Sequence, residues 1–186
     1  MRRAPPYSSA DLNALSPDGG GWRALGHGCG SARGAGTSCL HIAVDDGSRV
    51  SYAELLPDER KGAYAAFVGR CLGFFEGLGA AVERVMTDNG PGYRSRLFND
   101  LLDSRGVRHK YTRPFSPWQN GKAGRMDRTL AREWRYARAW ESDASRAEAL
   151  EAHMDHYEWD RPHGACGGLP LMSRIVGVNN VLAHNI

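Results

Sequence analysis

One amphipathic helix, predicted over residues 61–78, constrains the fold more than any other feature of the sequence. Its apolar side chains recur at i, i+3, i+4, i+7, i+8 and i+11 from Tyr64 to Phe75, which places them in a single stripe along the helix. Glycines at positions 77 and 79 end the helix. A helix with one apolar stripe buries it against a second layer, and the extended segments on either side indicate that this layer is a sheet.

Short segments with strand character flank this helix on both sides. Residues 40–44 and 49–56 are separated by an Asp-Asp-Gly-Ser turn, which predicts a β-hairpin. After the helix, strands are predicted over residues 81–87 and 106–112, with a helix over residues 96–104 between them. This alternation predicts an α/β fold in which helices flank a mixed sheet.

Two further helices are predicted after a loop over residues 113–120, and the second ends before Pro162, which cannot continue it. Residues 1–38 are rich in glycine, proline, serine and alanine and are predicted to be irregular, whereas residues 39–186 form one domain. The apolar faces of the two helices are predicted to consist of Met126, Leu130, Trp134 and Ala137, and of Ala147, Leu150, Met154 and Tyr157.

Positive charge is concentrated between residues 105 and 135, where nine arginines and lysines accompany only two acids. The same segment contains the aromatic residues Tyr111, Phe115, Trp118 and Trp134. Basic residues interleaved with aromatics are typical of surfaces that bind the phosphate backbone of nucleic acids. A solvated helix face has the same charge pattern, but the aromatics favour a nucleic-acid-binding protein.

The sequence offers no sign of a membrane or secreted protein. No apolar run reaches the roughly 20 residues that a membrane-spanning helix needs. The N-terminal arginines are not followed by the apolar core of a secretory signal. The four cysteines form no C-x-x-C pair, so reduced thiols in a cytoplasmic protein are expected.

A carboxylate, Asp88, directly follows the predicted strand over residues 81–87, in the sequence T-D-N-G. Asn-Gly is the strongest short turn signal, so the motif also has an ordinary structural interpretation. However, the carboxyl end of a strand in an open α/β sheet is the usual place of a functional site. Mg²⁺ prefers carboxylate oxygens, and phosphoryl-transfer sites often hold two such ions about 4 Å apart. One aspartate cannot hold two ions, so further acids are needed.

Several blocks of the sequence together resemble one known family. They are "TDNG" at residues 87–90, "RPFSPWQNGKAGRMDRTL" at 113–130 and "HYEWDRPHGACGGLPLMSR" at 156–174, with "PDGGGW" and "LHIAVDDGSRVSYAELLPDE" upstream. These blocks resemble the integrase core of bacterial insertion-sequence transposases, which are relatives of retroviral integrases. The resemblance implies a ribonuclease H-like fold, and two ions of Mg²⁺ or Mn²⁺ held by Asp, Asp and Glu. In such enzymes a metal-activated water cuts one DNA strand, and the freed 3′-hydroxyl attacks target DNA.

The catalytic acids that the resemblance implies are only partly present. Asp88 corresponds to the second acid, and the third lies after a gap of 35 residues, at the position that Gly124 occupies in "NGKAGR". Asp127 is about 4.5 Å further along the helix axis and has a shorter side chain than glutamate, so we do not expect it to substitute. The first acid corresponds to Asp11 if two residues are missing from the usual spacing, whereas an ungapped match places Ser9 there.

The resemblance also implies which residues face DNA, where they would contact phosphates rather than read bases. Two of them, Arg161 and His163, have bracing of the fold as an alternative role. Asp45 and Asp46 are expected only to cap the hairpin turn. The residues expected to bind DNA are Arg113, Trp118, Asn120, Lys122, Arg125, Arg128, Arg161 and His163.

The sequence thus predicts a transposase core domain that acts on element ends and target DNA, as a homodimer or a larger assembly. Gly124 removes one metal ligand, so strand cleavage is expected to be strongly reduced. The family usually carries an upstream helix-turn-helix region, for which this chain has no room, and this predicts a truncated and degenerate copy. Two alternatives stay open: an active enzyme that uses Asp11, Asp88 and Asp127, and a DNA-binding remnant without catalysis.

Overall fold

A five-stranded mixed sheet forms the centre of the molecule. The structure is a computed structural model that describes residues 22–29, 38–114 and 117–175. The strands are β1 (Trp22–Cys29), β2 (Cys39–Asp45), β3 (Ser51–Leu56), β4 (Arg84–Thr87) and β5 (Arg108–Tyr111). Their order in the sheet is β3-β2-β1-β4-β5. Strands β1, β2 and β3 pair antiparallel, whereas β1, β4 and β5 pair parallel, which confirms the predicted mixed sheet.

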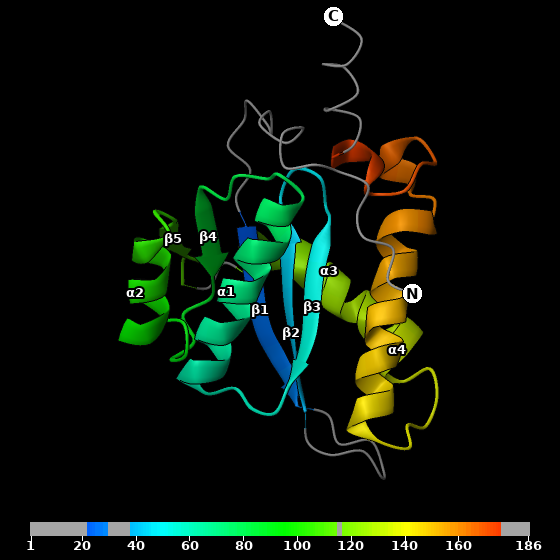
Figure 1. The fold of residues 1–186 in the computed structure, drawn as a ribbon, viewed down its shortest axis with the longest axis horizontal. Helices are drawn as coiled ribbons and strands as arrows, with labels where there is room; N and C mark the ends of the chain where they lie inside the picture. The colour runs from blue at the N-terminus through cyan, green and yellow to red at the C-terminus, as the bar shows by residue number, and fades with distance from the viewer. Residues whose placement is uncertain (1–21, 30–37, 115–116, 176–186) are drawn as a thin grey trace, which may run out of the picture.

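Helices cover both faces of this sheet (Figure 1). Helices α1 (Lys61–Gly77) and α2 (Arg96–Ser104) lie on one face, while α3 (Gly121–Leu130) crosses the other and α4 (Asp143–Asp155) lies beside β3. Helices α3 and α4 each continue into a π-helical segment. None of the helices in the described ranges has the length and apolar character needed to cross a membrane. The shorter helical segments are Pro117–Asn120, Ala131–Arg135, His156–Asp160 and Gly164–Cys166.

The stripe predicted along the first helix is buried as expected. Tyr64, Phe67, Leu72 and Phe75 of α1 are all buried and pack with Val85 of β4 in one continuous core. The helix begins one residue after Arg60, as predicted, and ends at Gly77, ahead of Gly79 in the left-handed conformation (φ 76°). Burial of this stripe fixes α1 on its face of the sheet, since each large apolar side chain contributes roughly 1.5–3 kcal/mol.

A second core forms on the opposite face. Leu40, Ile42 and Val44 alternate along β2, so they point together toward α3 and α4 and pack with Leu130 and Leu150. The residues between these three, His41 and Ala43, point to the opposite face and lie against α1. Strand β2 is therefore buried on both faces.

The predicted inner faces of the last two helices are correct except at two alanines. Ala137 and Ala147 are exposed. Trp140 and Arg146 are buried in their place, and Arg146 donates from Nη2 to the backbone oxygen of Ser38 at 3.2 Å. The π-helical segment after α3 shifts the helical register. Arg146 also lies 3.5 Å from Oδ1 of Asp143, and an apolar pattern does not anticipate such a buried cation.

The segment over residues 1–38, expected to be irregular, contains strand β1. Its sequence, WRALGHGC, has no β-branched residue, and the strand forms because β2 and β4 pair with it on both sides. Cys39 is disulfide-bonded, so the expectation of reduced thiols is wrong for this residue, whereas Cys71 and Cys166 are free.

Candidate active site and nucleic-acid interface

Asp88 lies directly after β4, at the carboxyl end of that strand, as the sequence predicts. Strand β4 is placed between β1 and β5, so the carboxylate emerges from the parallel half of the sheet. Its Oδ1 atom accepts a hydrogen bond from the backbone N–H of Gly90 at 2.8 Å. A Cβ atom at position 90 would stand only 2.9 Å from Oδ1. Glycine therefore allows the chain to fold back over its own carboxylate.

The loop that follows Asp88 is anchored on both sides. Asn89 donates from Nδ2 to the backbone oxygen of Thr112 at 2.9 Å, which ties the loop to the chain leaving β5. Tyr93 is 1% exposed, and its ring packs edge-on against Tyr64 with centroids 4.4 Å apart. At Gly92 any Cβ atom would overlap the Tyr64 ring. The carboxylate is therefore presented by a rigid loop.

A buried polar network that the sequence did not reveal supports the end of β4. Asn99 donates from Nδ2 to the backbone oxygens of Tyr93 and Ser95, so its Oδ1 accepts from Nδ1 of His109 at 2.7 Å. Nε2 of His109 lies 2.8 Å from the Thr87 hydroxyl oxygen, and that hydroxyl donates to the Asp88 backbone oxygen at 2.9 Å. Burial lowers the pKa of His109 to about 4, which keeps the ring neutral in this role. The partners are far apart in sequence and share no motif spacing that could have indicated them.

Gly124 lies in the second turn of α3 and faces open space. Apart from the neighbouring residues and the backbone of α3 itself, no atom of the described residues lies within 4 Å of the position that a Cβ at residue 124 would take. The residue offers neither a metal ligand nor a packing contact, so the position tolerates a longer side chain. Asp127, three residues further along α3, is already engaged: its Oδ1 is 3.0 Å from Nη2 of Arg135.

The described residues do not assemble a two-metal site. No group of three or more His, Cys, Asp or Glu side chains in these ranges is arranged to hold a metal ion. Strand β1, the neighbour of β4, contains no acid in its sequence. Asp11 and Ser9 lie outside the described residues. A two-metal centre needs several convergent carboxylates, and no such group of ligands is present around Asp88 in the described part of the chain.

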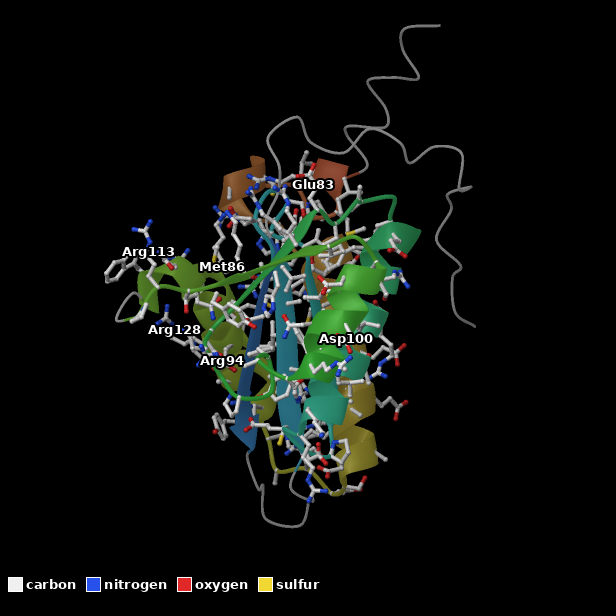
Figure 2. All side chains as sticks on the ribbon, turned by 90° about the vertical axis from the view of Figure 1, so that its left-hand side faces the viewer. Glu83, Met86, Arg94, Asp100, Arg113 and Arg128 are labelled. Carbon is white, nitrogen blue, oxygen red and sulfur yellow. The ribbon has the colours of Figure 1, made fainter. Side chains whose placement is uncertain are left out.

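An exposed basic surface lies beside this site. Arg113, Arg125 and Arg128 are exposed, and their guanidinium groups pair with none of the described acids. Trp118 is 72% exposed. Arg113 and Arg128 lie on the same flank of the molecule, away from Asp100 of α2 (Figure 2). Exposed guanidinium groups and aromatic rings are the side chains that contact phosphates and stack on bases, and the assignment of these residues to a nucleic-acid interface stays a prediction.

Of the other residues predicted to bind DNA, Lys122 pairs with an acid of the protein and Asn120 is buried. Nζ of Lys122 lies 2.5 Å from Oδ1 of Asp46 and donates to the Asp46 backbone oxygen. Asn120 is only 9% exposed. Asp45 caps the hairpin turn as predicted, because its Oδ2 accepts from both the N–H and the hydroxyl of Ser48.

Arg161 and His163 brace the end of the last helix. Nη1 of Arg161 donates to Oε2 of Glu133 at 2.6 Å, and its guanidinium lies over the Tyr157 ring. Nε2 of His163 is 3.0 Å from the Tyr157 backbone oxygen. The structural alternative that the sequence left open for these two residues therefore accounts for both side chains.

Comparison with known proteins identifies related sequences. Two family models, each described as "Integrase core domain", match residues 23–117 and 105–170. An insertion element IS476 uncharacterized 39.2 kDa protein of Xanthomonas euvesicatoria is 30% identical over 132 residues, which are 71% of this chain and 37% of that protein. A retrovirus-related Pol polyprotein from transposon TNT 1-94 of Nicotiana tabacum is 42% identical over 57 residues, 31% of this chain and 4% of the polyprotein. The chain thus spans well under half the length of these relatives.

Solved structures share the fold. A chain of the simian T-cell lymphotropic virus intasome, solved in complex with PP2A regulatory subunit B56 gamma, matches with a TM-score of 0.66 and 19% identity, covering 88% of this chain and 56% of that one. The catalytic core domain of BIV integrase matches with a TM-score of 0.64 and 16% identity, covering 88% of this chain and 97% of the other. The fold is therefore ribonuclease H-like, as the sequence predicted.

Proposed function

The chain belongs to the integrase core domain family, and we propose that it is a transposase core that binds DNA but cleaves it poorly. The proposal joins two features of the molecule. Its basic surface has the charge needed to hold a DNA backbone, and its described residues contain no group of ligands for a two-metal reaction.

The observation that carries the impairment is the environment of position 124. The glycine occupies the place of the third acid, and the space beside it is open, since no described atom lies within 4 Å of where a Cβ would stand. The nearest acid on the same helix, Asp127, is neutralised by Arg135. Metal ligands tolerate position errors of only about 0.2 Å, so an acid held by another residue one turn away is a poor replacement.

Members of this family normally use divalent metal ions. In this chain Mg²⁺ or Mn²⁺ would find Asp88, whose Oδ1 is already bonded to Gly90. A single carboxylate holds such ions weakly, and the described residues do not fit a pair of ions. Asp11 is the candidate for a second ligand and lies outside the described part of the chain.

DNA binding rests on the exposed guanidinium groups of Arg113, Arg125 and Arg128. They lack ion-pair partners among the described residues, so they are available to phosphates without first breaking an internal salt bridge. Because strand transfer joins two element ends, we also propose that the DNA-bound form is a homodimer or a larger assembly, which light scattering on element-end DNA would measure.

Cleavage of element-end DNA tests the proposal directly. The native chain, Gly124→Glu and Gly124→Ala are compared in Mg²⁺ and in Mn²⁺. The alanine variant controls for the gain in helix stability without adding a carboxylate. We expect little or no cleavage by the native chain and by Gly124→Ala, and robust cleavage by the native chain would refute the impairment.

The Gly124→Glu result then separates two forms of the proposal. Cleavage gained only in this variant would mean that Asp11 supplies the first acid, so that Gly124 is the single defect. No cleavage by any variant, with DNA binding retained, would favour the DNA-binding remnant without catalysis. In that case the N-terminal acid is missing as well.

A further inference from the structure

A groove of about 540 Å³ runs along β3, the edge strand of the sheet, between that strand and α4. The groove lies apart from Asp88, because Asp88 follows β4 and two strands, β2 and β1, separate β4 from β3 in the sheet. Tyr52, Phe74, Met154 and Trp159 give the groove an apolar lining, and Trp159 is 38% exposed at its wall. The groove therefore offers apolar contact area and is open to a partner.

The charged residues that line this groove are all acids. Its lining includes the acids Glu54, Glu151, Asp155 and Glu158 and contains no lysine, arginine or histidine. Glu54 is already paired with Arg70, at 2.6 Å, so it adds little free charge. Asp155 is exposed and forms no ion pair within the described ranges. In a chain with a net charge of +3, this is a local reversal of sign.

Glu158 gives the groove a buried polar group that the protein does not satisfy. The residue is only 4% exposed, and its Oε1 atom accepts from the N–H and the hydroxyl of Ser51 at 2.9 and 2.5 Å. Its Oε2 atom is also buried but has no hydrogen-bond partner in the described part of the chain. An unsatisfied buried acceptor costs roughly 1–3 kcal/mol, and a donor entering from the groove would remove this cost.

The ionisation of Glu158 points to the same kind of ligand. Burial raises the pKa of this carboxyl to about 7, although the hydrogen bonds from Ser51 oppose the shift. A nearby cation favours the charged form of a carboxyl. A guanidinium or ammonium group is therefore the complement that this site lacks, whereas a nucleic-acid phosphate would be repelled.

We propose that the groove along β3 and α4 binds an arginine-bearing segment of a partner protein. Asp155 attracts the guanidinium group, and the unpartnered Oε2 atom of Glu158 accepts a hydrogen bond from it. Apolar side chains of the segment pack against Phe74, Met154 and Trp159. Arginine suits the site better than lysine because its planar group provides several donors to carboxylate oxygens. The partner thereby occupies a groove along the edge strand β3 that includes none of Arg113, Arg125 and Arg128, so the basic surface stays free for DNA.

An NMR titration of the ¹⁵N-labelled full chain tests this. The probe is a short peptide that alternates arginine with leucine, and the matched control peptide alternates glutamate with leucine. We expect the arginine peptide to shift the Trp159 indole signal, assigned with Trp159→Phe, and the glutamate peptide to leave it unchanged. An absence of shift with the arginine peptide, or equal shifts with both, would overturn the proposal.

Charge-removing variants locate the site. Asp155 is exposed, so we expect Asp155→Asn to fold normally. It should lower the affinity for the arginine peptide about fivefold, which is the effect of losing one partly exposed charge pair. Glu148→Gln removes a charge from an exposed position of α4 outside the groove and should leave the affinity unchanged. Equal weakening by both variants would reduce the binding to general attraction and contradict a site.

Two further outcomes identify other occupants. If spermine shifts the Trp159 signal as strongly as the peptide does, the groove takes any polycation and the protein-segment proposal fails. If sedimentation shows that Asp155→Asn changes the oligomeric state of the chain alone, the occupant is a second copy of this chain, and the proposal of a separate partner fails.

Discussion

Nη2 of Arg135 lies 3.0 Å from Oδ1 of Asp127, and this ion pair engages the only acid of α3. The arginine side chain is just 11% exposed, so the pair is largely shielded from solvent. Arg135 belongs to the π-helical segment that follows α3 and reaches back over two turns to the carboxylate. Asp127 is thus engaged at the end of this helix, and we do not expect it to act as a metal ligand in place of Gly124.

Replacing Asp127 by asparagine separates these two roles. We expect Asp127→Asn to lower the free energy of unfolding by about 1 kcal/mol, because it breaks a partly buried ion pair. We also expect it to leave DNA cleavage unchanged in the native chain and in Gly124→Glu. Urea unfolding and the cleavage assay measure the two effects. Loss of cleavage without loss of stability would instead make Asp127 a catalytic acid.

Gly124 should be a position where substitution stabilises the fold. Glycine is roughly 1 kcal/mol less favourable than alanine within a helix, and a side chain at this position meets no atom within 4 Å. Gly124→Ala and Gly124→Glu should therefore both raise the free energy of unfolding, by about 0.5–1 kcal/mol, in urea titrations. A destabilised Gly124→Glu beside a stabilised Gly124→Ala would indicate that the new carboxylate is repelled by another negative charge, such as that of Asp88.

At Gly92, in contrast to Gly124, substitution should destabilise the fold. An added Cβ would overlap the buried Tyr64 ring, which packs against Tyr93 in the loop behind Asp88. We expect Gly92→Ala to cost about 1–3 kcal/mol, the usual range for overpacking a core. Gly73→Ala, at an exposed position in α1 with open space, is the matched control and should be neutral or stabilising. Similar effects of both substitutions would show that the Tyr64 ring moves aside freely.

The elements that sequence predicts well are those whose own periodicity decides their structure. The helix predicted over residues 96–104 has the same limits as α2, and the limits of α1 differ from the prediction by one residue. The stripe in α1 repeats over several turns, so packing and propensity agree. Strand β1 lacks such a pattern, since its position is determined by hydrogen bonds to β2 and β4, and composition alone predicts a loop there.

The candidate site likewise contains some features that the sequence predicts and others that it does not. Asp88 and the position of Gly124 follow from short local patterns and a fixed spacing. The network of Thr87, His109 and Asn99 could not be predicted, because each residue is unremarkable in its own segment and only the pairing of β4 with β5 brings them together. The ion pair of Asp127 with Arg135 depends on the π-helical shift after α3, which no periodicity of 3.6 residues anticipates.

The exposed arginines of α3 should control the salt dependence of DNA binding. Each phosphate contact changes the slope of log K against log salt concentration by about 0.9 for duplex DNA. We therefore expect Arg125→Gln and Arg128→Gln each to reduce the slope by about 1, measured by fluorescence anisotropy. Arg96→Gln, at an exposed α2 position paired with Asp100, is the control and should leave the slope unchanged. Equal reductions in all three variants would contradict a localised DNA surface.

Stability should fall as the pH rises past the ionisation of Glu158. Burial raises the pKa of this carboxyl from 4.5 to about 7, so between these values the folded state binds a proton that the unfolded state has released. The stabilisation is complete below the unfolded pKa and is lost as the pH rises through the folded one, a change of about 3 kcal/mol for this shift.

Glu158→Gln should remove this dependence, because the amide keeps an acceptor oxygen for Ser51 and does not titrate. Urea unfolding at a series of pH values between about 4 and 8, which bracket the two pKa values, would show a smaller decline in the variant than in the native chain. The variant should be the more stable protein at the alkaline end of this series, and the two should converge at the acidic end. An unchanged decline in Glu158→Gln would assign the pH dependence to another group and would mean that the buried carboxyl is ionised throughout this range.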